Sequence, residues 1–82
     1  METRVALIGI IVENTDYIES VNYLLHQYSR YIIGRMGIPY KEKEIHVISV
    51  VIDAPQDAIN ALTGKLGRIS GISAKTVYHN GR

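Results

Sequence analysis

The sequence predicts an α+β domain of the ferredoxin-like class, a four-stranded antiparallel sheet with two helices on one face. Two β-branched apolar runs, residues 4–14 and 44–53, are typical of buried strands. Apolar residues recur at helical spacing from about 16 to 29 and from 55 to about 68. With two weaker strands added, the order is β-α-β-β-α-β, in which strands one and three are central. At 82 residues without a low-complexity linker, we expect one domain, residues 1–82.

The first half of the chain supplies the first strand, a helix and an edge strand. After "RVALIGIIVEN", Asn14, Thr15 and Asp16 offer helix N-cap chemistry, and Asp16 with Glu19 would make a capping pair. The helix over 16–29 then has an apolar stripe of Ile18, Val21, Leu24, Leu25 and Tyr28. "YIIGRMGIPY" follows as a short or irregular strand, which Pro39 assigns to an edge of the sheet.

The second half begins with a polar turn, "KEKE" at 41–44, before the strong strand over 44–53. Pro55 fits the first turn of the next helix. The apolar stripe of that helix is Ile59, Leu62, Leu66 and Ile69. Gly71 is expected to end the helix in the left-handed conformation, and "ISAKTVY" is the last strand.

Both faces of the central strands are apolar. Strand one alternates Val5, Leu7 and Ile11 with Ala6, Ile8, Ile10 and Val12, and strand three alternates Val47 and Val51 with Ile48, Val50 and Ile52. Two helices cover only one face, and monomers rarely expose a large apolar patch. We therefore expect a homo-oligomer, a dimer or tetramer, formed through the open sheet face or by sheet extension.

The amino-acid composition excludes several classes of function. The chain has no cysteine, which excludes disulfides and thiolate metal sites and fits a cytoplasmic protein. No apolar run is long enough to span a bilayer, and the N-terminus lacks a signal-peptide pattern. The net charge of +1 argues against strong nonspecific binding of nucleic acid. Residues 58–82 nevertheless carry +4 and residues 1–57 carry −3, which indicates either an anion-facing end or chance.

"GKLGRISGISAK", residues 64–75, is the most unusual segment. It lacks the first glycine and the serine or threonine of a Walker A loop, and it follows a helix where a dinucleotide fingerprint follows a strand. The G-x-x-G clamp of KH domains needs a second helix, for which the chain has no room before the last strand. Two glycines within a helix, Gly64 and Gly67, favour close approach by a backbone, a neighbouring helix, another subunit or a ligand.

Two segments, "NALTGKLGRISGISAKTVYH" and "RYIIGRMGIPYKEKEIHVISVVID", resemble a known family, the small ACT-like proteins suggested to regulate the iron-only hydrogenase system. The resemblance covers nearly the whole chain and implies a ferredoxin-like fold, homo-oligomers and a role in regulation or maturation of that hydrogenase. The family is similar in fold to the ligand-sensing domain of the nickel-responsive repressor. Here the first strand begins by Arg4, so no DNA-binding segment is expected before it, and regulation would act through another protein of the hydrogenase system.

ACT-like domains commonly bind a small ligand near the first turn from strand to helix, which in this sequence contains Asn14 and Thr15. These residues either take part in a site for a small anion or simply cap the helix. The other candidate contacts are Arg35, Gly64, Lys65, Gly67 and Arg68.

We expect no metal site, since His26, His46 and His79 are scattered. His46 lies on the third strand, and neither His26 nor His79 has a second ligand at i+2 or i+4. We also expect no cofactor, and no catalytic constellation is present, so the prediction is a regulatory or ligand-sensing protein, not an enzyme. Two alternatives stay open. One is a nucleic-acid-binding module that uses the basic 64–75 end, and the other is a purely structural interaction subunit.

Overall fold

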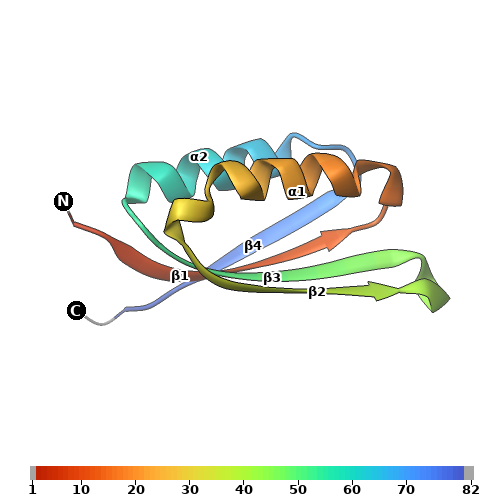
Figure 1. Cartoon of the computed structure of the whole chain (residues 1–82), viewed down its shortest axis with the longest axis horizontal. Coiled ribbons are helices and arrows are strands. Elements are labelled where there is room, and N and C mark those ends of the chain that lie inside the picture. The colour runs from red at the N-terminus through yellow and green to blue at the C-terminus, as the bar shows by residue number, and fades with distance from the viewer. Residues whose placement is uncertain (1, 81–82) are drawn as a thin grey trace.

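A computed structural model of the chain describes residues 2–80. It contains four strands, β1 (Arg4–Val12), β2 (Ile32–Tyr40), β3 (Ile45–Ala54) and β4 (Ile72–Tyr78), and two helices, α1 (Ile18–Gln27) and α2 (Gln56–Gly67). All strand pairs are antiparallel, in the order β2-β3-β1-β4, and both helices cover the same face (Figure 1). The predicted ferredoxin-like class and the central place of β1 and β3 are confirmed.

The core lies between the helices and one face of the sheet. The fully or almost fully buried side chains are Ala6, Ile8, Ile10, Val12, Val21, Leu24, Leu25, Ile48, Val50, Ile52, Ala54, Ile59, Leu62 and Leu66. The strand members are the even-numbered residues of β1 and β3, because successive side chains point to opposite faces. The helix members come from the two predicted stripes, with Ile18, Tyr28 and Ile69 half-buried at the margins.

Two local predictions were wrong. The segment expected to be short or irregular is a nine-residue strand, β2, whose pairing with β3 shifts register only between Ile32 and Gly34. Asp16 and Glu19 do not form the expected capping pair, because Asn14 Oδ1 accepts a hydrogen bond from Asp16 N at 2.9 Å. That turn starts a short 3₁₀ segment, η1 (Thr15–Tyr17), so α1 itself begins at Ile18.

Gly71 does adopt the left-handed conformation, with φ +76°, but it does not cap α2 directly, because Arg68 holds the C-cap position. It serves the connection into β4. Its carbonyl accepts a hydrogen bond from Glu13 N at 2.7 Å, and a Cβ on Gly71 would lie 3.1 Å from the Cβ of Asn14. This contact ties the α2–β4 connection to the β1–α1 turn.

The second face of the sheet has no covering layer among the described residues (Figure 1). We call it the open face, and its large apolar side chains, besides the half-buried Ile45 at the start of β3, are Val5, Leu7, Ile11, Met36, Ile38, Tyr40, Val47, Val51 and Val77. Val47 and Val51 are half-buried by their neighbours and the others are exposed. The two-sided apolar pattern predicted for β1 and β3 is thus present in the fold, although the chain itself covers only one side.

Candidate functional site

The β1–α1 turn lies at the same end of the molecule as the β2–β3 turn (Figure 1). Antiparallel pairing of β1 with β3 produces this arrangement, because Val12 at the end of β1 is opposite His46 near the start of β3. The β2–β3 connection is a 3₁₀ segment, η3 (Lys41–Lys43), followed by Glu44 with a left-handed φ of 54°. The sheet therefore brings Thr15 close to a polar turn more than twenty residues away in sequence.

A hollow of about 340 Å³ lies between these two turns. Its lining residues, which define what we call the turn hollow, are Thr15, Pro39, Tyr40, Lys41, Glu44, Ile45 and His46. Pro39 and His46 are opposite each other in the β2–β3 pair, and their register places both on the helix side of the sheet. This volume is in the lower part of the range of roughly 300–1,000 Å³ that is usual for small-molecule sites.

The polar residues of the turn hollow combine a cation, Lys41, with an acid, Glu44, and with the hydroxyl-bearing Thr15. Tyr40 also lines the hollow, although strand register places its side chain on the open face. His46 is half-buried and supplies two ring nitrogens. Across residues 2–80, no side-chain hydrogen bond of the structure occupies any of these groups. The hollow can therefore offer donors for an anionic group and an acceptor at Glu44.

The basic residues predicted as anion contacts do not converge on this hollow. Arg35 lies on β2 and donates from Nη2 to Asn22 Oδ1 on α1 at 2.6 Å. Lys65 lies on α2 and donates from Nζ to the Tyr28 hydroxyl at 3.1 Å, with Nζ 5.3 Å from the centre of that ring. Arg68 is exposed at the C-cap of α2. Among the predicted site residues, only Thr15 lines either of the hollows described here.

The two helical glycines are exposed on α2, and an added Cβ at Gly64 or Gly67 would meet nothing within 4 Å. The expected close approach by a neighbouring helix or backbone therefore does not occur inside the described chain. Contact with another subunit or with a ligand stays a prediction for both positions.

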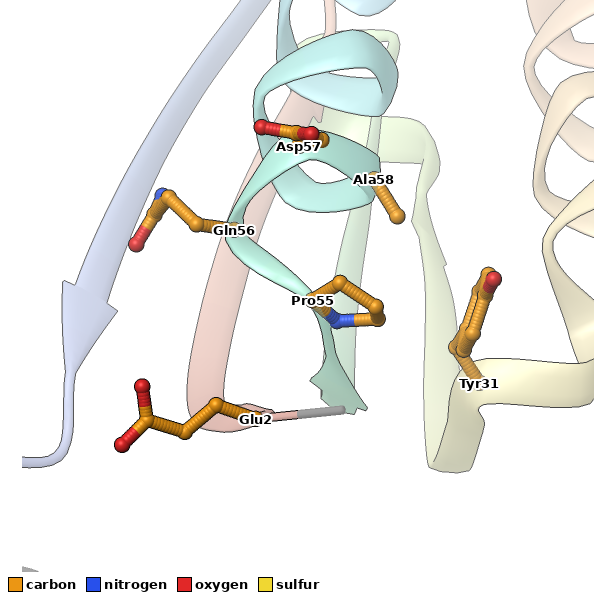
Figure 2. Close-up of a pocket in the computed structure, with 6 residues that line it drawn as sticks. All are labelled: Glu2, Tyr31, Pro55, Gln56, Asp57 and Ala58. Atoms are coloured by element: carbon orange, nitrogen blue, oxygen red, sulfur yellow. The ribbon is translucent and has the colours of Figure 1, made fainter.

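A second hollow, of about 440 Å³, lies at the start of α2 and is lined by Glu2, Tyr31, Pro55, Gln56, Asp57 and Ala58. Figure 2 shows Pro55 and Ala58 facing the Tyr31 ring, whereas the carboxylates of Glu2 and Asp57 lie apart. Its charged groups are both acids, which disfavours an anion. The Gln56 amide already donates to Tyr78 Oη at 2.8 Å and to Asn60 Oδ1 at 3.0 Å. We therefore take the turn hollow as the candidate site.

The three histidines occupy separate places: His26 is exposed on α1, His79 follows β4, and His46 lines the turn hollow. Over residues 2–80, no group of three or more His, Cys, Asp or Glu side chains could hold a metal ion. None of the described helices is both long and apolar enough to cross a membrane.

Sequence reasoning missed Tyr40, Lys41 and His46 as neighbours of Thr15. The available signal was topological. In the predicted β-α-β-β-α-β order, the turn after the second strand returns to the end of the sheet where the first strand finishes. The composition of the "KEKE" segment alone predicts only a polar turn, although that order places it beside the first strand–helix turn.

Solved structures confirm the class of fold. A formyltetrahydrofolate deformylase from Pseudomonas putida KT2440 superposes with a TM-score of 0.68 at 13% identity, covering 95% of this chain and 30% of that one. An unknown protein from Galdieria sulphuraria superposes at 0.66 with 10% identity, covering 99% of this chain and 48% of that one. At such low identities the likeness concerns the fold alone. The class is therefore a ferredoxin-like α+β domain.

The sequence comparison is more specific. The model of the TM1266-like family, described as "Iron-only hydrogenase system regulator, putative", matches residues 4–76, and this chain belongs to that family. The uncharacterized protein TM1266 from Thermotoga maritima is 40% identical, with a TM-score of 0.90 over 94% of this chain and 98% of that one. No protein of curated function matches the sequence. The family resemblance identified from residues 30–53 and 60–79 is confirmed.

Proposed function

We propose that this protein regulates the iron-only hydrogenase system by binding, without catalysis, and that a small ligand with an anionic group binds in the turn hollow. The family description supports the regulatory role. The ligand proposal depends on one observation, the gathering of Lys41, His46, Thr15 and Tyr40 around a hollow of about 340 Å³. We further propose that the protein acts in the cytoplasm through another protein of that system.

The chemistry of the hollow narrows the ligand. Lys41 supplies a cation, and the Thr15 hydroxyl and an N–H of His46 can donate hydrogen bonds to carboxylate or phosphate oxygens. Glu44 would weaken the binding of a ligand that is only anionic, such as phosphate, without preventing it, because Lys41 and His46 supply donors. A ligand that also carries an ammonium or hydroxyl group would fit better, because Glu44 can accept from it. Pro39 and Ile45 contribute apolar surface to the lining of the hollow.

The test is native mass spectrometry of protein purified from its source, with Lys41→Ala and Lys43→Ala as a matched pair. Both lysines belong to η3, but only Lys41 lines the turn hollow. We expect a small co-purified mass in the wild type and in Lys43→Ala, and its loss from Lys41→Ala. Inorganic phosphate, as a reference anion, should raise the melting temperature of the same two proteins more than that of Lys41→Ala.

Retention of the bound mass in Lys41→Ala would contradict the assignment of the site. Absence of any bound mass, together with no response to phosphate in the wild type, would contradict the ligand-binding role itself.

The nucleic-acid alternative is not favoured by the arrangement of its cations. Lys75 is opposite Gly9 in the β1–β4 pair and lies on the open face, whereas Lys65 lies on α2, on the opposite side of the sheet. A basic surface that tracks a phosphate backbone needs its cations on one side. The 64–75 segment therefore does not present one continuous basic surface.

A further inference from the structure

We propose that two copies of this chain pack open face against open face, about a two-fold axis that passes beside Leu7, with Asp53 of each copy paired to Lys75 of the other. This inference is independent of the ligand proposed above. It depends on four features of the sheet: its apolar surface, its edges, its charges and its area.

The apolar surface follows the strand register across the whole sheet. One row crosses Val51, Leu7 and Val77, and another crosses Ile38, Val47 and Ile11. Leu7 is 42% exposed at the middle of β1, and Val77 is 65% exposed. Between the two rows lies a third row, Met36, Ser49, Gly9 and Lys75. Its two middle residues are small, so they leave a shallow depression between the long side chains of Met36 and Lys75, which a side chain of a second sheet can enter.

The two edges are less suited to association than the face. β2 carries Pro39, which cannot donate to a ladder, and its register shifts near Gly34. The middle residue of β4 is Lys75, so antiparallel pairing of two β4 strands in central register would place two lysines opposite each other. Proline, register shifts and lysines are the usual devices that protect sheet edges from strand addition. Lys75 also lies on the open face, but there an acid of opposite charge, Asp53, is available to pair with it across a contact between two faces.

The charges on the open face match a two-fold arrangement. Among strand residues on that face, Asp53 and Lys75 are the two that carry charge, and their signs are opposite. Asp53 on β3 is opposite Val5, and Lys75 on β4 is opposite Gly9. Since β3 and β4 flank β1, Leu7 is the midpoint between the two charges. An axis in the plane of the sheet at Leu7 therefore exchanges them, as an isologous interface requires.

The exposed area is also that of an unpaired subunit. The chain exposes 5621 Å², about 700 Å² more than the roughly 4,900 Å² expected of a monomer of this mass. A standard protein interface buries roughly 800 Å² on each partner. An interface of that standard size on the open face would bury an area comparable to this surplus.

The experiment measures the mass of the full chain by size-exclusion chromatography with light scattering and its dimer constant by sedimentation equilibrium. The wild type should be a dimer or a dimer-based oligomer without added ligand. Leu7→Glu should be monomeric and retain its circular dichroism spectrum, because it places two carboxylates at the axis. The matched control is Tyr23→Glu, which adds the same charge at an exposed site on α1 and should stay associated.

A charge-reversal series tests the orientation. Asp53→Lys and Lys75→Asp should each weaken the dimer, by roughly tenfold, since each reversal replaces two ion pairs with two repulsive contacts. The combined variant should return to the wild-type constant, because the pairs are restored with exchanged signs. If Leu7→Glu does not fold, this series still tests whether the open face forms the dimer interface.

A wild type that stays monomeric at high concentration would overturn the proposal and leave the open face to a different protein. If Leu7→Glu leaves the dimer constant unchanged, the interface lies on another surface and the proposal is overturned. If the combined variant dimerises as weakly as the single charge reversals, the two-fold pairing of Asp53 with Lys75 is wrong.

Discussion

The covered and open faces of the sheet are built from the same kinds of side chain. Ile8 and Leu7 are neighbours on β1, but Ile8 is fully buried under the helices whereas Leu7 is 42% exposed. The difference arises from the helices alone, because alternation along a strand supplies both faces equally. The apolar residues of the covered face explain stability, and those of the open face need another explanation. Monomers rarely expose a contiguous apolar patch as large as the open face. We therefore expect the apolar residues of that face to serve association with another molecule.

The largest expected effect tests whether side chains on the two faces contribute differently to the free energy of unfolding. Ile8→Ala should lower the free energy of unfolding by about 3 kcal/mol, since it leaves a cavity in a closed core. Leu7→Ala should lower it by less than about 1 kcal/mol, because part of that side chain is already in water. Urea unfolding of both variants at high dilution makes the comparison. Equal losses would show that the open face is packed as tightly as the core.

A smaller effect is expected at the connection that closes the covered layer. Gly71→Ala should cost about 1–2 kcal/mol, because a Cβ is disfavoured at φ +76° and would meet the Asn14 side chain. Gly64→Ala is the matched control, and it should stabilise the chain by up to about 1 kcal/mol, since its Cβ enters open space on a helix. Thermal unfolding separates the two. A destabilised Gly64→Ala would reveal a contact at α2 that the isolated chain does not contain.

The fold could be predicted from the sequence because periodicity reports which side of an element is apolar, and two helices can cover only one side of four strands. The full length of β2 could not be predicted from the sequence. A proline such as Pro39 interrupts a central strand, but an edge strand can accommodate it when its backbone nitrogen faces solvent. The start of α1 depended on which side chain captures the N–H of Asp16. For the site, Lys41 and His46 meet Thr15 only through the pairing of distant strands, whereas Lys65 and Arg35 are joined to neutral partners that local sequence does not reveal.

The smallest expected effect comes from a substitution that tests directly whether the open face is an interface. Val77→Thr keeps the shape and strand preference of a side chain that is 65% exposed on β4. In the dissociated chain it should change the free energy of unfolding by less than about 0.5 kcal/mol, as exposed surface substitutions usually do. If the open face is an interface, however, the buried hydroxyl should weaken the dimer measurably in sedimentation equilibrium, because it loses water without a defined partner. Val12→Thr, on the covered face, should destabilise the chain itself at every protein concentration, since its site is closed in the single chain. A concentration-dependent loss for Val77→Thr and a concentration-independent one for Val12→Thr would distinguish a face covered by a second copy from a face covered by the chain's own helices.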